Sequence, residues 1–233
     1  MRYLIILALS AVANSVHSHH SPSFLRPSAY IAEDDDSLLH LSQSENNRLL
    51  IGVLTQPIDD GMRSKAPEAL AGYKSFIQAS YIQALEASGS RTIPLFFDTA
   101  NLTEELAKLD HLNGVQYCGG DGSPEYLEFG RHVYDRVKEI NDAGTTLPIW
   151  GTCLGMQYLS IYAADAGEKI LTENAFDSND ANYPLEFLMP TNDIRMFEPL
   201  GNSAQRFTYR NLTYNHHHDG VRPEAFAEDK GLR

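Results

Sequence analysis

The sequence has few cysteines, which form disulfides in small domains, and few of the basic residues that bind polyanions. Only two of its 233 residues are cysteine, Cys118 and Cys153. Two cysteines cannot form the disulfide framework of a small secreted module, and their spacing matches no zinc-ligand pattern, so we expect no metal. Lysine and arginine number 18 against 31 aspartate and glutamate residues, a formal net charge of -13. Because nucleic-acid surfaces need clustered basic side chains, we expect no nucleic-acid partner.

Long hydrophobic runs are also lacking. The apolar run 3–9 follows Arg2 and precedes the small-x-small sequence 11–13. It is too short to cross a bilayer core of about 30 Å, so we expect no membrane span. A basic residue, a short apolar run and a small-residue cleavage site predict a secretory signal peptide over residues 1–13.

Residues 14–47 have little hydrophobic periodicity. They carry a cluster of histidines and serines and an acidic run at 33–36. This composition predicts a flexible leader or propeptide, with a metal-binding histidine cluster as the alternative. Two N-glycosylation sequons, at Asn101 and Asn211, agree with passage through the secretory pathway.

From residue 48 the pattern becomes that of an α/β domain. Continuous apolar runs alternate with segments in which apolar residues recur at helical spacing. The expected strands are 49–54, which ends at Thr55-Gln56-Pro57, 91–97, 114–118 and 147–150, and the expected helices are 73–85, 102–109, 126–140 and 156–164. Short strand-like pieces follow at 185–188 and 207–214. The succession predicts one domain over 48–233, with a doubly wound, mostly parallel sheet and helices on both faces.

The sequence Gly151-Thr152-Cys153-Leu154-Gly155 has the form of a nucleophile elbow, a sharp turn from a strand into a helix. Glycines on both sides allow so tight a turn. The helix that follows aims free N–H groups and its positive end at the sulfur, which predicts a lowered thiol pKa. We therefore expect Cys153 to be a catalytic nucleophile, with a buried structural cysteine as the alternative.

A glycine pair, Gly119-Gly120, ends the preceding expected strand. In a parallel sheet this strand end should lie beside the elbow. The backbone N–H groups of Gly120 and Leu154 would then form an oxyanion hole, and Gly119 would lie near the substrate. An ordinary loop is the alternative for the pair.

These residues carry a resemblance to the gamma-glutamyl hydrolase family, whose fold is like that of class I glutamine amidotransferases. The similarity covers about residues 48–226. Its most specific part is Pro148-Ile149-Trp150-Gly151-Thr152-Cys153-Leu154-Gly155-Met156. The other matches are 49–54, 79–86 with Gly89 and Pro94, Gly119-Gly120, 184–187, 195–197 and 212–215.

The resemblance implies hydrolysis of γ-glutamyl bonds in folylpoly-γ-glutamates, through a thioester on Cys153 and without any cofactor. It also implies a location in the extracellular space, the lysosome or the vacuole. An amidotransferase that feeds ammonia to a synthase is disfavoured by the signal peptide and by the lack of a synthase domain.

The chain departs from the family pattern near its C-terminus. The family's general base is a histidine in a Trp-His-Pro-Glu type motif, and the sequence up to Arg233 has no such motif. Aligned on Leu212-Thr213, His217 falls where the family has another active-site histidine, with His216 as the fallback if the register slips by one. A solvated loop and an adventitious metal site are the alternatives for this histidine run.

Cys118 is a second departure, because the family commonly has proline at that position. We expect a free, partly buried thiol, with a Cys118–Cys153 disulfide as the alternative. Two hypotheses for the whole chain remain: an active cysteine hydrolase, and an inactive or truncated secreted paralogue that only binds γ-glutamyl ligands. Without the family's final strand and helix, we expect lower stability or homo-oligomerisation.

Overall fold

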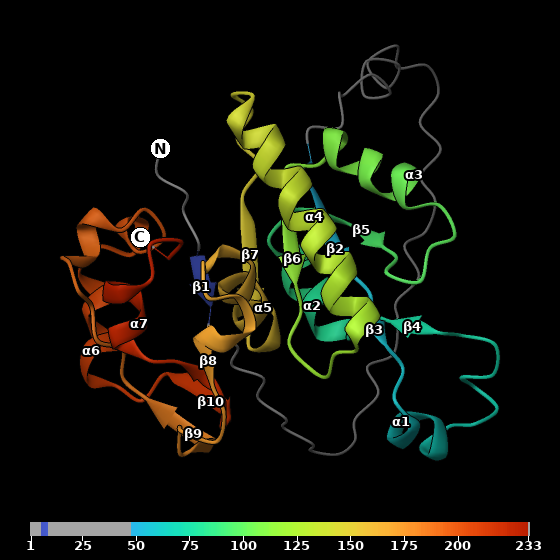
Figure 1. Ribbon diagram of the computed structural model, residues 1–233. Coiled ribbons are helices and arrows are strands. Elements are labelled where there is room, and N and C mark those ends of the chain that lie inside the picture. Colours follow the sequence, from blue (N-terminus) through green and yellow to red (C-terminus); the bar gives the residue numbers. More distant parts are fainter. Residues whose placement is uncertain (1–5, 9–47, 233) are drawn as a thin grey trace, which may run out of the picture. The chain divides into compact units, whose positions relative to one another are not determined.

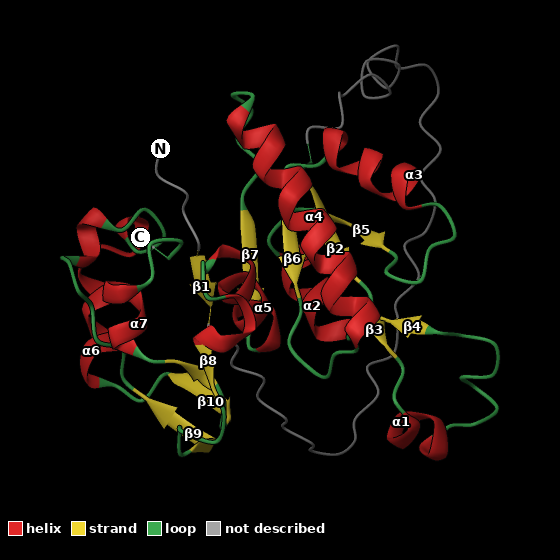
Figure 2. Ribbon diagram, in the orientation of Figure 1, coloured by secondary structure: helices red, strands yellow, loops and turns green. Residues whose placement is uncertain are grey.

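The computed structural model describes residues 6–8 and 48–232 (Figures 1 and 2). Its main feature is a five-stranded sheet in the order β1-β7-β6-β2-β5, with every neighbouring pair parallel. The strands are β1 (Ile6–Ala8), β2 (Leu50–Leu54), β5 (Arg91–Leu95), β6 (Gly114–Tyr117) and β7 (Ile149–Thr152). The helices that follow them are α2 (Ala79–Ala87), α3 (Leu102–Ala107), α4 (Pro124–Asp142) and α5 (Leu154–Ala163). The predicted α/β fold with a parallel sheet is confirmed.

Helices cover both faces of this sheet. On one face the Tyr117 hydroxyl donates a 2.7 Å hydrogen bond to the carbonyl of Gly130 in α4, and Figure 1 shows α4 passing in front of the strands. The preceding residue of β6, Gln116, instead lines a groove of about 630 Å³ together with Tyr81 and Leu85 of α2. Because successive side chains of a strand point to opposite faces, α2 and α4 lie on opposite sides of the sheet.

The main core lies between the sheet and helices α4 and α5. Helix α4 begins where Ser123 accepts a hydrogen bond from the backbone N–H of Tyr126, with Pro124 in the first turn. Its buried residues recur at helical spacing, which gives the helix one apolar face. The buried core residues include Leu54, Leu95, Val115, Tyr117, Tyr126, Phe129, Val133, Val137 and Leu159.

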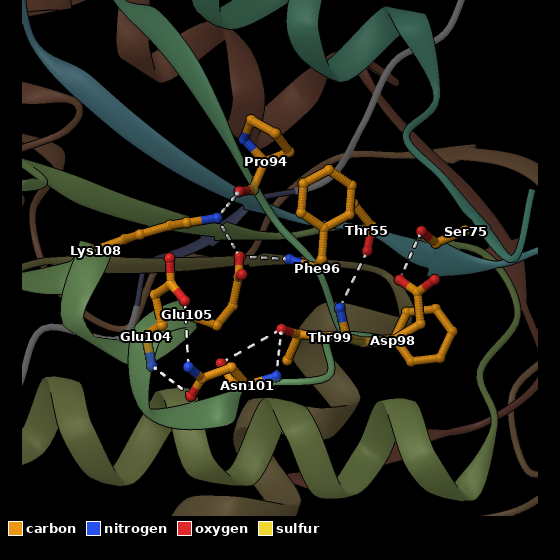
Figure 3. Close-up of polar contacts among 11 residues, drawn as sticks. Thr55, Ser75, Pro94, Phe96, Asp98, Thr99, Asn101, Glu104, Glu105 and Lys108 are labelled. Carbon is orange, nitrogen blue, oxygen red and sulfur yellow. Dashed lines mark hydrogen bonds and ion pairs between the residues drawn. The ribbon is translucent and has the colours of Figure 1, made fainter.

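Polar contacts fix α3 against the end of β5 (Figure 3). The Asn101 side chain accepts a 3.2 Å hydrogen bond from the N–H of Glu104 and so caps the helix. The buried carboxylate of Glu105 accepts from the backbone N–H of Phe96 at 2.9 Å and pairs with Lys108 at 2.6 Å. These contacts satisfy one N-terminal donor of α3 and the charge of a buried acid.

Replacing Asn101 by alanine should lower the free energy of unfolding by about 1 kcal/mol, because the first turn of α3 loses its side-chain acceptor. The measurement is urea unfolding of protein made without glycosylation, since Asn101 is also a sequon. Asn101→Asp keeps the acceptor and should stay close to wild type. Equal stability of wild type and Asn101→Ala would show that the cap does not contribute.

Shorter elements make up the rest of the described chain. Three two-stranded antiparallel sheets pair β3 with β4, β9 with β10, and β8 with β11. Their bounds are β3 (Gln56–Pro57), β4 (Ser75–Phe76), β8 (Leu171–Thr172), β9 (Ser178–Tyr183), β10 (Thr213–His217) and β11 (Gly220–Val221). The short helices are α1 (Asp60–Lys65), α6 (Arg206–Tyr209) and α7 (Pro223–Glu228), with 3-10 turns at 108–111, 167–170, 191–193 and 198–205.

Two expected elements are wrong in part, and a third is not formed. The helix expected over 73–85 begins only at Ala79, because residues 75–76 form β4 and pair with β3. The strand expected at 185–188 is not formed, and β9 ends before it. The strand expected at 207–214 begins only at Thr213, after α6.

The predicted leader and most of the predicted signal peptide lie outside the described residues. The exception is Ile6–Ala8, which forms β1 and pairs with residues 150–152 of β7. Removal of residues 1–13 would therefore take β1 from the sheet and leave that edge of β7 unpaired. In the described part of the chain, no helix has both the length and the apolarity needed to span a membrane.

Candidate active site

Cys153 lies on a tight turn between β7 and α5, as the glycine pattern predicts. Its backbone has φ 52° and ψ -112°, a left-handed φ that is rare for a residue other than glycine. A Cβ on Gly151 would lie 2.6 Å from the backbone of Gly155. A Cβ on Gly155 would lie 2.7 Å from the carbonyl carbon of Tyr117 in β6. Only glycine fits at either position, so the strained turn is held by close backbone packing on both sides.

Two backbone amides converge on the sulfur. The N–H groups of Leu154, at the start of α5, and of Gly120, after β6, face Cys153 Sγ and act to lower the pKa of its thiol. Burial nevertheless raises the pKa of the Cys153 thiol above its ordinary value; the two amides oppose this shift, and the Asp121 carboxylate adds to it. The expected lowering of this pKa is therefore wrong, because loss of solvent outweighs the hydrogen bonds.

The Gly119-Gly120 turn lies beside the elbow, as expected from neighbouring parallel strands. Tyr117 of β6 pairs with Gly151 of β7, which brings the two strand ends together. A Cβ on Gly119 would lie 2.8 Å from the Cβ of Cys153, so this glycine allows the close approach. Gly120 has φ +138°, a conformation that other residues rarely adopt.

Sequence reasoning gave no role to Tyr81 and Gln56, which contact this turn. The Tyr81 hydroxyl of α2 accepts a 2.7 Å hydrogen bond from the N–H of Gly119, and burial raises its pKa to about 12. The Gln56 side chain, 1% exposed, packs against Gly120: a Cβ there would lie 2.8 Å from its Nε2. A polar residue directly after an apolar strand was the available signal for Gln56.

The structure separates the two candidate histidines. His216 is 60% exposed, and its Nδ1 lies 3.3 Å from the Asp180 carboxylate, to which Tyr214 also donates. His217 is only partly exposed, and its Nδ1 lies 3.0 Å from the carbonyl oxygen of Asp219. The side-chain contacts of His216 thus lie within the two-stranded β9–β10 sheet, whereas His217 contacts Asp219, which is hydrogen-bonded to α5.

His217 is linked to the nucleophile helix through one shared acceptor. Gln157, one turn after Cys153, donates a 2.9 Å hydrogen bond to the same Asp219 carbonyl. Because a carbonyl oxygen only accepts, Nδ1 of His217 carries a proton, and Nε2 of the neutral ring keeps its lone pair. This tautomer can accept a proton at Nε2. In the described residues no histidine is hydrogen-bonded to the sulfur itself.

Both cysteines are free thiols, as expected, although Cys118 is fully buried rather than partly buried. Burial raises the pKa of Cys118 to about 12. Among the described residues, no group of three or more histidine, cysteine or acidic side chains could hold a metal ion. The chemistry that this arrangement can support is attack by the Cys153 sulfur on a carbonyl carbon, with two N–H donors near the developing oxyanion.

Comparisons with known proteins give the same family as the motifs. No protein-family model matches the chain. Gamma-glutamyl hydrolase B of Dictyostelium discoideum is 28% identical over 84% of this chain and 55% of its own length. Gamma-glutamyl hydrolase 2 of Arabidopsis thaliana is 30% identical over 99% of this chain and 66% of its own length. The bovine gamma-glutamyl hydrolase is 35% identical over 64% of this chain and 44% of its own length.

The chain thus spans about half the length of the curated relatives it matches, 55% and 53% for two of them. The part that is shared includes the strand, elbow and helix around Cys153, which form the site described above. The agreement of several such relatives, from an amoeba, a plant and mammals, shows that the chain belongs to the gamma-glutamyl hydrolase family.

Proposed function

We propose that the chain is a cysteine hydrolase that cleaves γ-glutamyl bonds in folylpoly-γ-glutamates. The observation that carries this proposal is Cys153 on its strained elbow, with the N–H groups of Gly120 and Leu154 directed at the sulfur. The choice of a γ-glutamyl bond as the bond that is cleaved rests on the names of the relatives. The secretory pathway, with the extracellular space or a lysosome or vacuole as destination, is the compartment that we propose from the sequence.

The reaction would proceed in two steps. In the first, Cys153 Sγ bonds to the γ-carbonyl carbon while Gly120 and Leu154 donate to the oxyanion; the C–N bond then breaks, and the amine leaves with the thiol proton. In the second, water attacks the thioester, the carboxylic acid is released, and the sulfur regains a proton. Because burial raises the pKa of the thiol, the first step needs a base to remove this proton.

We propose His217 for this proton transfer. Its Nδ1–H is held by the Asp219 carbonyl, so Nε2 is the acceptor, and Gln157 ties the same carbonyl to the helix that begins at Leu154. His216 is a poor choice, since its ring contacts the exposed Asp180 carboxylate of β9.

His217→Ala should therefore lower the rate of hydrolysis at least about 100-fold, the usual range for loss of a general base. His216→Ala is the matched control and should keep the wild-type rate within a factor of two or so. The measurement is kcat for glutamate release at saturating substrate. If the two variants behaved alike, proton transfer would have to be assigned elsewhere.

A second candidate is a protein that binds γ-glutamyl ligands without cleaving them. The raised pKa of Cys153, and the absence in the described residues of a histidine hydrogen-bonded to the sulfur, favour it. Such a protein would keep the elbow and the donors, because they would still bind a carbonyl oxygen.

The test is release of glutamate from folylpenta-γ-glutamate by the full chain, beside Cys153→Ser and beside the α-linked peptide. Cleavage of the γ-linked substrate alone, lost in Cys153→Ser, would support the hydrolase. Ligand binding by calorimetry without cleavage would support the second candidate. Neither binding nor cleavage by a folded chain would exclude both.

A further inference from the structure

Gln56 is a buried polar side chain whose amide group has no partner. The residue is 1% exposed, and neither its Nε2 nor its Oε1 has a hydrogen-bond partner among the described residues. An unpaired buried polar group usually costs about 1–3 kcal/mol. A methionine or leucine of similar volume would avoid this cost. The stability of the resting structure therefore gives no reason for a glutamine at this position.

A nearby glutamine shows what a structural role looks like. Gln116, also buried, donates from Nε2 to the carbonyl oxygen of Tyr117 at 2.7 Å and to Thr152 Oγ1 at 3.2 Å. It thereby ties β6 to β7 just before the elbow. The side chain of Gln56 makes no such connection, yet its carboxamide lies against Gly120, the residue whose N–H faces Cys153 Sγ.

The Gly119-Gly120 turn must change its hydrogen bonds during the proposed reaction. In the resting structure the Gly120 N–H is directed at the sulfur. When a carbonyl carbon bonds to this sulfur, the oxyanion replaces the sulfur as the acceptor, so the Gly119–Gly120 peptide has to rotate. The turn can rotate because neither residue has a Cβ. When this peptide rotates, the carbonyl oxygen of Gly119 moves with it. The Gln56 carboxamide lies beside this turn, and its Nε2 has N–H donors without a partner.

We propose that Gln56 is a positioning residue for the oxyanion donor. Its carboxamide Nε2 donates a hydrogen bond to the backbone carbonyl of the Gly119–Gly120 peptide when the Gly120 N–H moves from the sulfur to the oxyanion. A bond that is absent in the resting enzyme and made during the reaction lowers the barrier without stabilising the ground state. The inference concerns the site of the proposed function, but it depends only on carbonyl attack at Cys153.

Gln56→Met tests the proposal, with Gln116→Met as the matched control. The readout is the rate at which Cys153 is modified, followed by mass spectrometry of its peptide so that Cys118 is counted separately. A 4-nitrophenyl carbamate is attacked at its carbonyl carbon, so an oxyanion develops before 4-nitrophenolate leaves and a stable thiocarbamate remains on the sulfur. Methyl methanethiosulfonate presents no carbonyl and loses methanesulfinate as sulfur bonds to sulfur.

For Gln56→Met we expect the carbamoylation rate to fall about tenfold, less than the loss from removing an oxyanion donor outright. The methanethiosulfonate rate should stay within about twofold, and the thermal midpoint should equal or exceed that of wild type, because unpaired polar groups are removed. Gln116→Met should lower the midpoint by several degrees, since it breaks two buried hydrogen bonds.

Equal carbamoylation rates in wild type and Gln56→Met would overturn the proposal. So would a parallel fall in both rates, or a midpoint lowered as in Gln116→Met, since each would indicate a structural role. Neither reagent carries a glutamyl group. Failure of the chain to release glutamate would therefore count against the hydrolase while leaving this comparison intact.

Discussion

Gly155→Ala is expected to lower the free energy of unfolding by about 3 kcal/mol or more and to abolish any reaction at Cys153. The added methyl carbon would lie 2.7 Å from the carbonyl carbon of Tyr117 and closer still to its oxygen. Both neighbours are backbone atoms of a buried central strand, so no side-chain rotation relieves the collision. Either β6 moves away from β7 or α5 moves outward, and each change displaces the elbow. The measurement is thermal unfolding, with the midpoint lowered by roughly 10 °C.

Gly144→Ala serves as the control for this prediction. Gly144 follows α4 with φ +100°, and a Cβ there would have nothing within 4 Å. The substitution adds backbone strain without a collision and should cost about 1 kcal/mol. If Gly155→Ala cost no more than Gly144→Ala, the contact between α5 and β6 could not be as close as described.

The elbow was predictable because its signals are local in the sequence. A continuous apolar run, two glycines around a cysteine, and helical spacing afterwards all fall within residues 147–164. The neighbouring Gly119-Gly120 turn followed from the order of parallel strands, which depends only on the alternation of strands and helices. The parallel sheet and the placement of Gly120 and Leu154 at the sulfur could thus be expected before the structure.

What the sequence did not predict depends on distant contacts. Residues 73 and 76 continue the helical spacing of α2, yet Phe76 pairs with Gln56 in a short antiparallel sheet. The pKa of Cys153 was expected to fall because the helix start is visible in the sequence, whereas burial of the sulfur is not. The burial of Gln56 could not be predicted, because it depends on contact with Gly120, which is more than 60 positions away in the sequence.

Alkaline pH is expected to destabilise the fold through ionisation of Cys118, more strongly than through ionisation of Cys153. This side chain is fully buried, and burial raises its pKa from 9.0 to about 12. In the unfolded chain the thiol ionises near its ordinary pKa, while in the folded chain it stays protonated. The stability from this group is therefore complete below about pH 9 and is lost progressively as the pH rises toward about 12.

The expected loss between pH 8 and 11 is about 3 kcal/mol, from 1.36 kcal/mol for each pH unit over which only the unfolded thiol is ionised. Urea unfolding under reducing conditions measures it. Cys118→Ala, which starts less stable because of the cavity, should lose correspondingly less over the same range. Buried tyrosines such as Tyr81, with its pKa raised to about 12, destabilise both proteins alike at high pH, so the difference between the two curves isolates the thiol. Parallel curves would contradict the prediction, because they would mean that Cys118 ionises equally in the folded and unfolded chains despite its burial beside the Gly119-Gly120 turn.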